Sequence, residues 1–145
     1  MTDKVQTITL YTDGASRGNP GPAAIGVWIE TLGKTYGVTI GETTNNDAEY
    51  QALIFGLKKI KSLIGNARAK RTRVQCFLDS ELVVRQLNHE YKITDAQMQQ
   101  HFMTIWNLML DFDSVTFTHV PRAKNRIADR AANDALDAPE QPMIV

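Results

Sequence analysis

Four carboxylates stand where predicted strands end or where predicted helices turn an apolar face toward the protein. Asp13 and Asp79 each end an apolar segment, and Glu49 and Asp129 lie in amphipathic helical segments. If folding brings all four together, their mutual repulsion raises their pKa values. The usual partner of such a cluster is a hard divalent cation such as Mg²⁺ or Mn²⁺. Two such ions about 3.5–4 Å apart can promote hydrolysis of a phosphodiester.

Each of these acids also has an ordinary explanation when it is taken alone. An Asp at a strand end or a Glu in a first helical turn often caps a helix or complements its dipole. The spacing favours a shared site instead. Glu49 lies one turn before Leu53, the first residue of an apolar stripe, and this spacing points the carboxylate toward the sheet. Asp129 has Ala132 at i+3 and is therefore also on an apolar face.

Strands and helices must alternate along the chain to position these acids. Alternating and β-branched residues predict five strands, over Ile8–Asp13, Ala23–Glu30, Lys34–Ile40, Arg73–Asp79 and Val115–Val120. Helical periodicity predicts a helix from Asp47 to a stop at Gly65-Asn66 and further helices over Ser80–Asn88, Asp95–Leu110 and Asn125–Leu136. The run of glycine and proline after Asp13 is expected to end the first strand, and Leu32-Gly33 to form a hairpin turn.

This order of elements predicts an α/β fold. We expect a five-stranded mixed sheet flanked by helices, in which three antiparallel N-terminal strands are followed by two parallel strands. The core is expected to include an apolar stripe on the helix predicted over Asp95–Leu110, namely Met98, Phe102, Ile105, Trp106 and Met109.

Composition predicts one globular domain. The chain has 145 residues, of which 43% are hydrophobic and 22% are charged, and we expect residues 1–145 to form one domain with a core over about 6–137 and a tail over 138–145. Sixteen basic residues balance sixteen acidic ones, so affinity for a polyanion must come from local charge.

A single cysteine and the absence of a long apolar run predict a cytoplasmic protein with no membrane association, which we expect to be a monomer. The apolar end of the tail, residues 143–145, is expected to pack on a groove or a sheet edge or to fray.

The four acids occur in ordered sequence blocks. These blocks are YTDGASRGNPGP at 11–22, TNNDAE at 44–49, DS at 79–80 and NRIAD at 125–129. Over about residues 6–137 they strongly resemble ribonuclease H, type 1. The resemblance implies the ribonuclease H-like fold and endonucleolytic cleavage of the RNA strand of an RNA–DNA hybrid by a two-metal-ion mechanism, leaving 5′-phosphate and 3′-hydroxyl ends.

The resemblance also implies roles for individual residues. It implies that two Mg²⁺ ions, or Mn²⁺ in their place, are held by Asp13, Glu49, Asp79 and Asp129. Asp13 bridges both ions, Glu49 and Asp79 serve the ion at the leaving 3′-oxygen, and Asp129 helps to hold the ion that activates water. The expected contacts to the hybrid are Gly14, Ala15, Ser16, Arg17 and Gly18 along the RNA strand, Asn19, Asn45 and Asn46 at the minor groove, and Thr44 at a DNA-strand phosphate. Without the resemblance, turn or cap chemistry explains the asparagines equally well.

Two departures from the family pattern concern the basic residues. The loop Pro121–Asn125 lacks the histidine that many members carry, and Arg122 is expected to hold phosphate there as a catalytic residue, with Lys124 as a substrate contact. A guanidinium cannot titrate near neutrality as an imidazole does. The span Asn88–Thr94 offers no basic handle, as in the handle-less, archaeal-like bacterial subgroup.

The sequence leaves open the role of one basic run and two rival functions. The run comprises Lys58, Lys59, Lys61, Arg68, Lys70, Arg71 and Arg73, and it is either a nucleic-acid patch or a solvated helix end whose cations complement the dipole. The rival functions are a DNA-processing enzyme of the same superfamily and a non-catalytic module that binds hybrids. The glycine-rich loop argues against the first, and the complete acidic set argues against the second.

Overall fold

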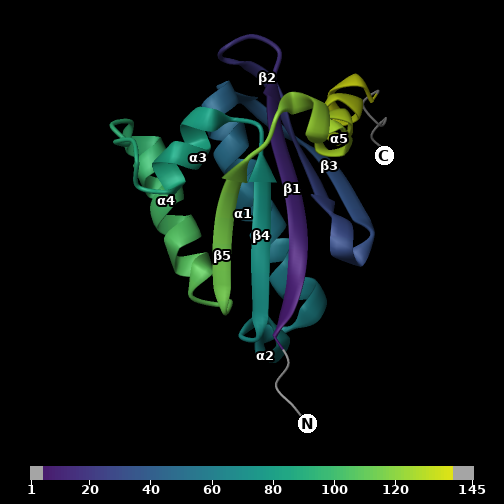
Figure 1. Ribbon diagram of the computed structural model, residues 1–145. Coiled ribbons are helices and arrows are strands. Elements are labelled where there is room, and N and C mark those ends of the chain that lie inside the picture. Colours follow the sequence, from purple (N-terminus) through teal and green to yellow (C-terminus); the bar gives the residue numbers. More distant parts are fainter. Residues whose placement is uncertain (1–4, 139–145) are drawn as a thin grey trace, which may run out of the picture.

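One mixed sheet with the strand order β3-β2-β1-β4-β5 forms the centre of the protein. The central strand β1 (Gln6–Ser16) pairs antiparallel with β2 (Gly21–Ile29), which pairs antiparallel with β3 (Lys34–Thr43). On its other side, β1 pairs parallel with β4 (Thr72–Leu78), and β4 pairs parallel with β5 (Ser114–His119) (Figure 1). This strand order and these pairings confirm the predicted five-stranded mixed sheet. This computed structural model describes residues 5–138.

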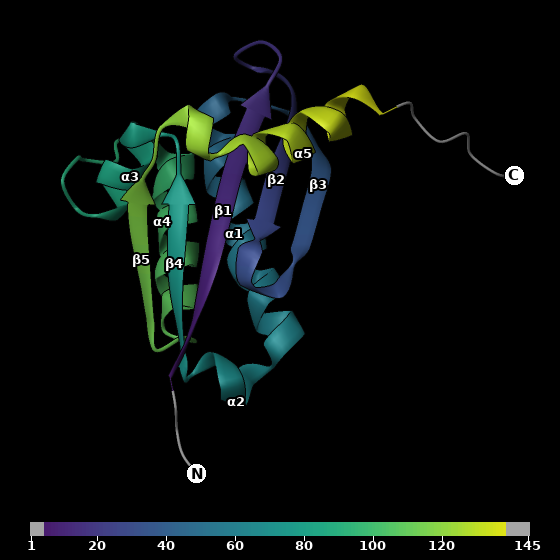
Figure 2. The same ribbon diagram turned by 45° about the vertical axis from the view of Figure 1, so that its right-hand side comes forward.

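Helices cover both faces of the sheet. α1 (Asn45–Ile64) and α4 (Ala96–Met109) lie behind the sheet in Figure 2, whereas α5 (Arg126–Asp137) crosses in front of it. The shorter elements are α2 (Asn66–Ala69), α3 (Glu81–Leu87) and two 3₁₀ turns, η1 (Glu30–Leu32) and η2 (Arg122–Lys124). No helix among residues 5–138 is both long and apolar enough to cross a membrane.

α1 is held to the sheet by its apolar stripe. Leu53, Leu57 and Ile60 are fully buried in the same core as strand residues of β1, and burial of each such side chain contributes about 1.5–3 kcal/mol. The helix begins two residues earlier than predicted because Thr44 is its N-cap, where Oγ1 accepts a hydrogen bond from the Asp47 N–H at 3.2 Å. It ends at Gly65, as predicted.

The expectation that the first strand ends at Asp13 is wrong. β1 continues through Gly14–Ser16, which pair with Ala23–Ile25 of β2. The turn is confined to the residues between them and is closed by a hydrogen bond from the Arg17 N–H to the Pro22 carbonyl (2.8 Å). The connection from β2 to β3 is also longer than the predicted two-residue turn, because η1 precedes Gly33, whose φ of +64° reverses the chain.

The predicted core stripe of α4 is partly wrong. Met98 and Ile105 are buried, and Phe102 and Met109 pack against the core, but Trp106 is 47% exposed. Neighbouring residues of a helix are rotated by about 100°, so the burial of Ile105 turns Trp106 toward solvent. The predicted packing of the apolar tail concerns residues 143–145, which lie outside the described residues.

Part of the basic run is used within the protein. The Lys61 ammonium pairs with Asp111 at 2.9 Å, and Arg73 pairs with Asp113 at 3.3 Å. Lys59 Nζ lies 5.0 Å from the centre of the Tyr36 ring. These contacts favour the helix-end interpretation of this run over a nucleic-acid patch.

Candidate active site

The register of the parallel strands places Asp13 beside Asp79. The last parallel pair of β1 and β4 joins Thr12 to Leu78. Asp13 and Asp79 directly follow this pair in sequence, so both carboxylates lie at the same edge of the sheet. Asp13 is only 5% exposed. Sites at the carboxyl ends of parallel strands are common in α/β proteins, and the continuation of β1 beyond Asp13 leaves this placement unchanged.

Gly14 lets the start of α1 approach β1 closely. A Cβ atom on Gly14 would lie 2.3 Å from the backbone carbon of Ala48 and 2.4 Å from the backbone nitrogen of Glu49. This contact brings Glu49, which is 6% exposed, next to Asp13. The backbone N–H of Gly14 acts on the Glu49 carboxylate and lowers its pKa, which favours the charged form. The Glu49 carboxylate therefore points toward the sheet, as predicted.

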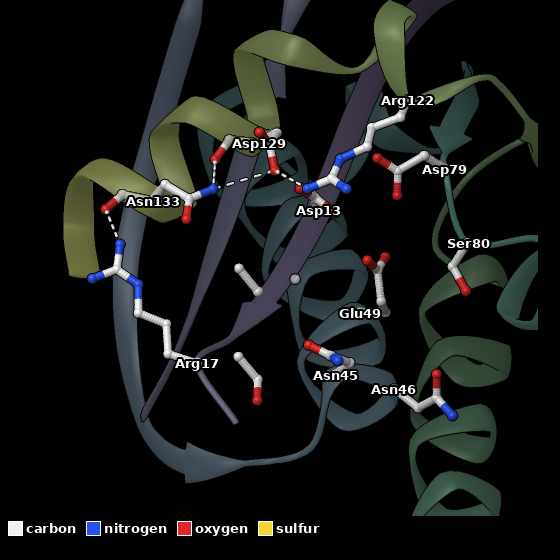
Figure 3. A pocket seen from close by; sticks show the side chains of 13 residues that line it. Asp13, Arg17, Asn45, Asn46, Glu49, Asp79, Ser80, Arg122, Asp129 and Asn133 are labelled. Carbon is white, nitrogen blue, oxygen red and sulfur yellow. Dashed lines mark hydrogen bonds and ion pairs between the residues drawn. The ribbon is translucent and has the colours of Figure 1, made fainter. Parts of the chain in front are cut away.

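A second glycine brings Asp129 to the same edge. A Cβ atom on Gly26 would lie 1.8 Å from the Ala128 carbonyl oxygen, so α5 can lie on β2 only because this position has no side chain. Asp129 follows directly in α5 and faces the cluster (Figure 3). Its Oδ1 accepts a hydrogen bond of 3.3 Å from Nδ2 of Asn133, one turn later.

The acids form a cluster of mutually repelling charges. Asp13, Glu49 and Asp79 can each offer a carboxylate oxygen so that the three atoms lie within 4.8 Å of one another. Burial raises the pKa of Asp13 well above its ordinary value, and the neighbouring Glu49 and Asp79 raise it further. Burial likewise raises the pKa of Glu49, against hydrogen bonds from Asp13 and Gly14. Such an arrangement has the donor atoms and the charge to hold hard divalent cations.

A pocket of about 480 Å³ opens over this cluster (Figure 3). Its lining contains the four acids, the start of the glycine-rich run and the start of α1. The lining residues are Asp13, Gly14, Ala15, Ser16, Arg17, Asn45, Asn46, Glu49, Asp79, Ser80, Arg122, Asp129 and Asn133. Most of the predicted site residues are therefore gathered around one opening.

Four predicted substrate contacts do not line the pocket. Gly18 and Asn19 lie at the exposed tip of the β1–β2 turn, Thr44 caps α1, and Lys124 is exposed in η2. Asn19 instead joins the turn to α1, because its Oδ1 accepts a hydrogen bond of 3.0 Å from the Asn45 N–H. This hydrogen bond links the β1–β2 turn to the start of α1.

The two arginines of the pocket face acids. The Arg122 guanidinium is 83% exposed and lies 3.9 Å from Asp129 Oδ1. Figure 3 shows the Arg122 guanidinium between Asp129 and Asp79. Arg17 forms an ion pair of 2.7 Å with Asp137 near the end of α5, which ties the glycine-rich run to that helix.

Sequence reasoning missed the role of Asn125. This side chain is 1% exposed, and its Nδ2 donates to the Thr12 carbonyl (2.9 Å) and to Asp79 Oδ2 (3.3 Å). Asn125 therefore fixes one of the acids to β1. The only signal in the sequence is its position before the last helix, which an N-cap explains as well. Ser80, the N-cap of α3, and Asn133 were also missed as pocket residues, although the i+4 spacing of Asn133 from Asp129 is visible.

Replacement of Asn125 by Asp is expected to destabilise the metal-free protein by about 2–4 kcal/mol, because it buries a carboxylate beside Asp79 with no donor to satisfy it. The loss should shrink as the pH falls toward the ordinary pKa of Asp, where the new carboxyl is protonated in both the folded and the unfolded state. Urea unfolding with a chelator at neutral and acidic pH measures both effects.

Asn88→Asp is the matched control for this change. The Asn88 amide also donates to a strand carbonyl, that of Phe117 at 3.1 Å, but its side chain is exposed. We expect this variant to lose no more than about 1 kcal/mol. Equal losses in the two variants would contradict the importance of the buried position.

Comparisons with known proteins agree with this geometry. A family model described as reverse transcriptase-like matches residues 11–135. Ribonuclease HI of Halobacterium salinarum is 40% identical over 93% of this chain and 67% of its own length. A bifunctional protein of Mycobacterium tuberculosis is 37% identical over 92% of this chain, which spans only 36% of that protein.

Solved structures give the same result. The crystal structure of RNase H1 from Halobacterium salinarum superposes with a TM-score of 0.82 at 39% identity, covering 90% of this chain and 98% of the other. The LC11 RNase H1, in complex with an RNA/DNA hybrid, superposes with a TM-score of 0.82 at 38% identity, covering 90% of this chain and 96% of the other. Sequence blocks, sheet topology and similarity over nearly the whole chain thus point to one family, and this chain is a member of the type 1 ribonucleases H.

Proposed function

We propose that this protein is an endoribonuclease that hydrolyses the RNA strand of RNA–DNA hybrids and leaves 5′-phosphate and 3′-hydroxyl ends. The observation that carries the proposal is the convergence of Asp13, Glu49 and Asp79 within 4.8 Å, under a pocket whose rim holds the glycine-rich run and two asparagines. Membership of the ribonuclease H family and the hybrid bound to the LC11 relative support the substrate.

The residues present fit a divalent-cation cofactor. The donors are all carboxylate oxygens, and Glu49 Oε2 is buried without a hydrogen-bond partner. We propose two Mg²⁺ ions, for which Mn²⁺ can substitute, held by the three clustered acids and by Asp129, which lies outside the 4.8 Å group and is proposed to serve the second ion. When bound, the ions supply a water of lowered pKa and stabilise negative charge on the phosphate.

The chain's own residues bind and orient the hybrid. Small residues over Gly14–Ser16 leave the backbone open to an RNA strand, where backbone groups can hydrogen-bond the 2′-hydroxyls that distinguish RNA from DNA. Asn45 and Asn46 reach the same opening and can contact base edges in the minor groove. Arg122 is proposed to hold the phosphate as it is released, since its guanidinium is exposed and stands over the acids.

One cleavage assay tests the proposal. The protein is incubated with a hybrid labelled on each strand in turn, in Mg²⁺, in Mn²⁺ or in a chelator, with duplex DNA as the control. We expect only the RNA strand of the hybrid to be cut, only with metal, with product ends identified by mass spectrometry. Binding without cleavage in either metal would favour a hybrid-binding module, and cleavage of DNA would favour a DNA-processing enzyme.

Assembly and location are also part of the proposal. A single ribonuclease H domain with one free, buried cysteine, Cys76, is proposed to act as a monomer in the cytoplasm. Light scattering coupled to size-exclusion chromatography measures the mass.

A further inference from the structure

The first turn of α1 contains a buried carboxylate, Asp47, that is not part of the acidic cluster. Asp47 is 1% exposed, although it is in the first turn of a helix, where acids are usually solvated. Its carboxylate accepts three side-chain hydrogen bonds. Thr43 Oγ1 donates to Oδ2 at 2.8 Å, Gln51 Nε2 donates to the same oxygen, and His101 Nε2 contacts Oδ1 at 2.6 Å. These donors come from three elements, β3, α1 and α4.

The contact to His101 joins the start of α1 to the neighbouring helix α4. The His101 ring stacks on Tyr50, with ring centres 6.0 Å apart. The Tyr50 hydroxyl donates to Gln86 Oε1 of α3 at 2.7 Å, and Gln86 Nε2 donates to the Lys92 carbonyl in the α3–α4 loop at 3.3 Å. A network of hydrogen bonds and one ring contact thus runs from that loop to the first turn of α1.

Helix capping does not require this network, because Thr44 already caps α1 through the Asp47 N–H. Asn45 and Asn46, which share the first turn with Asp47, and Glu49, which follows that turn, all line the pocket. The start of α1 is tied to the β1–β2 turn on its outer side through Asn19. On its inner side, the start of α1 is held to α4 by the contact of the Asp47 carboxylate with His101.

We propose that Asp47 and His101 are positioning residues, which hold the first turn of α1 so that Asn45 and Asn46 meet the hybrid. Neither residue lines the pocket, so they act through their neighbours. This inference rests on the proposed function, since it assigns the two asparagines to hybrid binding. It predicts that loss of the contact weakens binding of the hybrid more than it slows the chemical step.

The test compares two replacements of His101. His101→Phe keeps a ring against Tyr50 but removes the donor to Asp47, whereas His101→Gln restores an N–H donor. We expect His101→Phe to raise KM for the hybrid about fivefold to tenfold, with kcat within about twofold of wild type, and His101→Gln to return KM to within about twofold. The Kd of the hybrid, measured on an Asp13→Asn background, should change in parallel with KM.

Asp95→Ala is the matched control. The Asp95 side chain caps the same helix, α4, by accepting from the backbone N–H groups of Gln97 and Met98, and it makes no contact with α1 among the described hydrogen bonds. It should lower the Tm and leave KM unchanged. An unchanged KM in His101→Phe, an equal rise in Asp95→Ala, or no rescue by His101→Gln would overturn the inference.

Two other experimental outcomes also decide the inference. If His101→Phe does not fold, Gln51→Leu removes another donor from the same carboxylate, and the same rise in KM is expected; its absence overturns the inference. If the wild-type chain binds hybrid without cutting it, the proposed activity is wrong, and the comparison of Kd values still decides whether Asp47 and His101 position the asparagines.

Discussion

Replacement of Asp13 by Asn should abolish cleavage of the hybrid and at the same time stabilise the metal-free protein. Asp13 lies between Glu49 and Asp79, so its loss removes a shared cation ligand, and we expect cleavage to fall by at least about 10³-fold. The gain in stability has a separate cause. Burial and the neighbouring acids raise the pKa of Asp13, so at neutral pH folding must either keep a buried charge there or take up a proton, and both oppose folding. An amide has the same shape, and it donates to the adjacent carboxylates.

The pH dependence distinguishes this explanation from a general effect of the substitution. The pKa of Asp13 is higher in the folded than in the unfolded protein, so this group destabilises the folded protein at pH values above its unfolded-state pKa. The cost disappears at low pH, where Asp13 is protonated in both states. The advantage of Asp13→Asn in a chelator should therefore be largest near neutral pH and shrink toward about pH 4, close to the ordinary pKa of Asp. Circular dichroism melts and hybrid cleavage measure the two effects.

Asp113→Asn provides the control for the same chemical change at the surface. Asp113 is exposed and pairs with Arg73, so the variant should keep full activity and nearly the wild-type Tm at both pH values. A lower Tm for Asp13→Asn than for wild type in a chelator would contradict the proposed repulsion. Retained cleavage would contradict the proposed activity.

The main features of the site could be predicted because they depend on local patterns. Asp13 and Asp79 follow strand segments, and parallel strands end at one edge of a sheet, so their proximity follows from the topology alone. Glu49 could be placed because its spacing from Leu53 fixes the helix face it shares. These inferences need only the period of a strand or of a helix.

The features that could not be predicted depend on partners distant in the sequence. β1 continues past Asp13 because β2 pairs with Gly14–Ser16, although the residue types there favour a turn. The burial of Asp47 depends on α4, 54 residues away, whose His101 supplies the contact. Asn125 bonds to Thr12 across 113 residues. No periodicity carries such information, and these contacts determine how firmly the predicted residues are held.

Gly14→Ala is expected to impair the site without changing any proposed ligand. The new methyl group would lie 2.3–2.4 Å from backbone atoms of Ala48 and Glu49. Backbone cannot rotate aside as a side chain does, so α1 must shift away from β1, and Glu49 must move with it away from Asp13. We expect cleavage to fall by about 10²-fold, since a displacement of about 1 Å in a catalytic group has effects of this size, with a loss of stability of about 1–3 kcal/mol. Cleavage rates over a Mg²⁺ titration and urea unfolding measure the two effects.

Gly33→Ala separates the displacement of α1 from the cost of an alanine at a glycine position. Gly33 has a φ of +64° and no neighbouring atom within 4 Å of an added Cβ, so alanine there strains the backbone but displaces nothing. We expect a loss of about 1 kcal/mol with cleavage unchanged. If the two variants lost activity equally, instability alone would explain the effect. A selective loss in Gly14→Ala, with a higher Mg²⁺ concentration needed for half-maximal cleavage, is the result expected if the close contact of β1 with α1 sets the spacing of the acids.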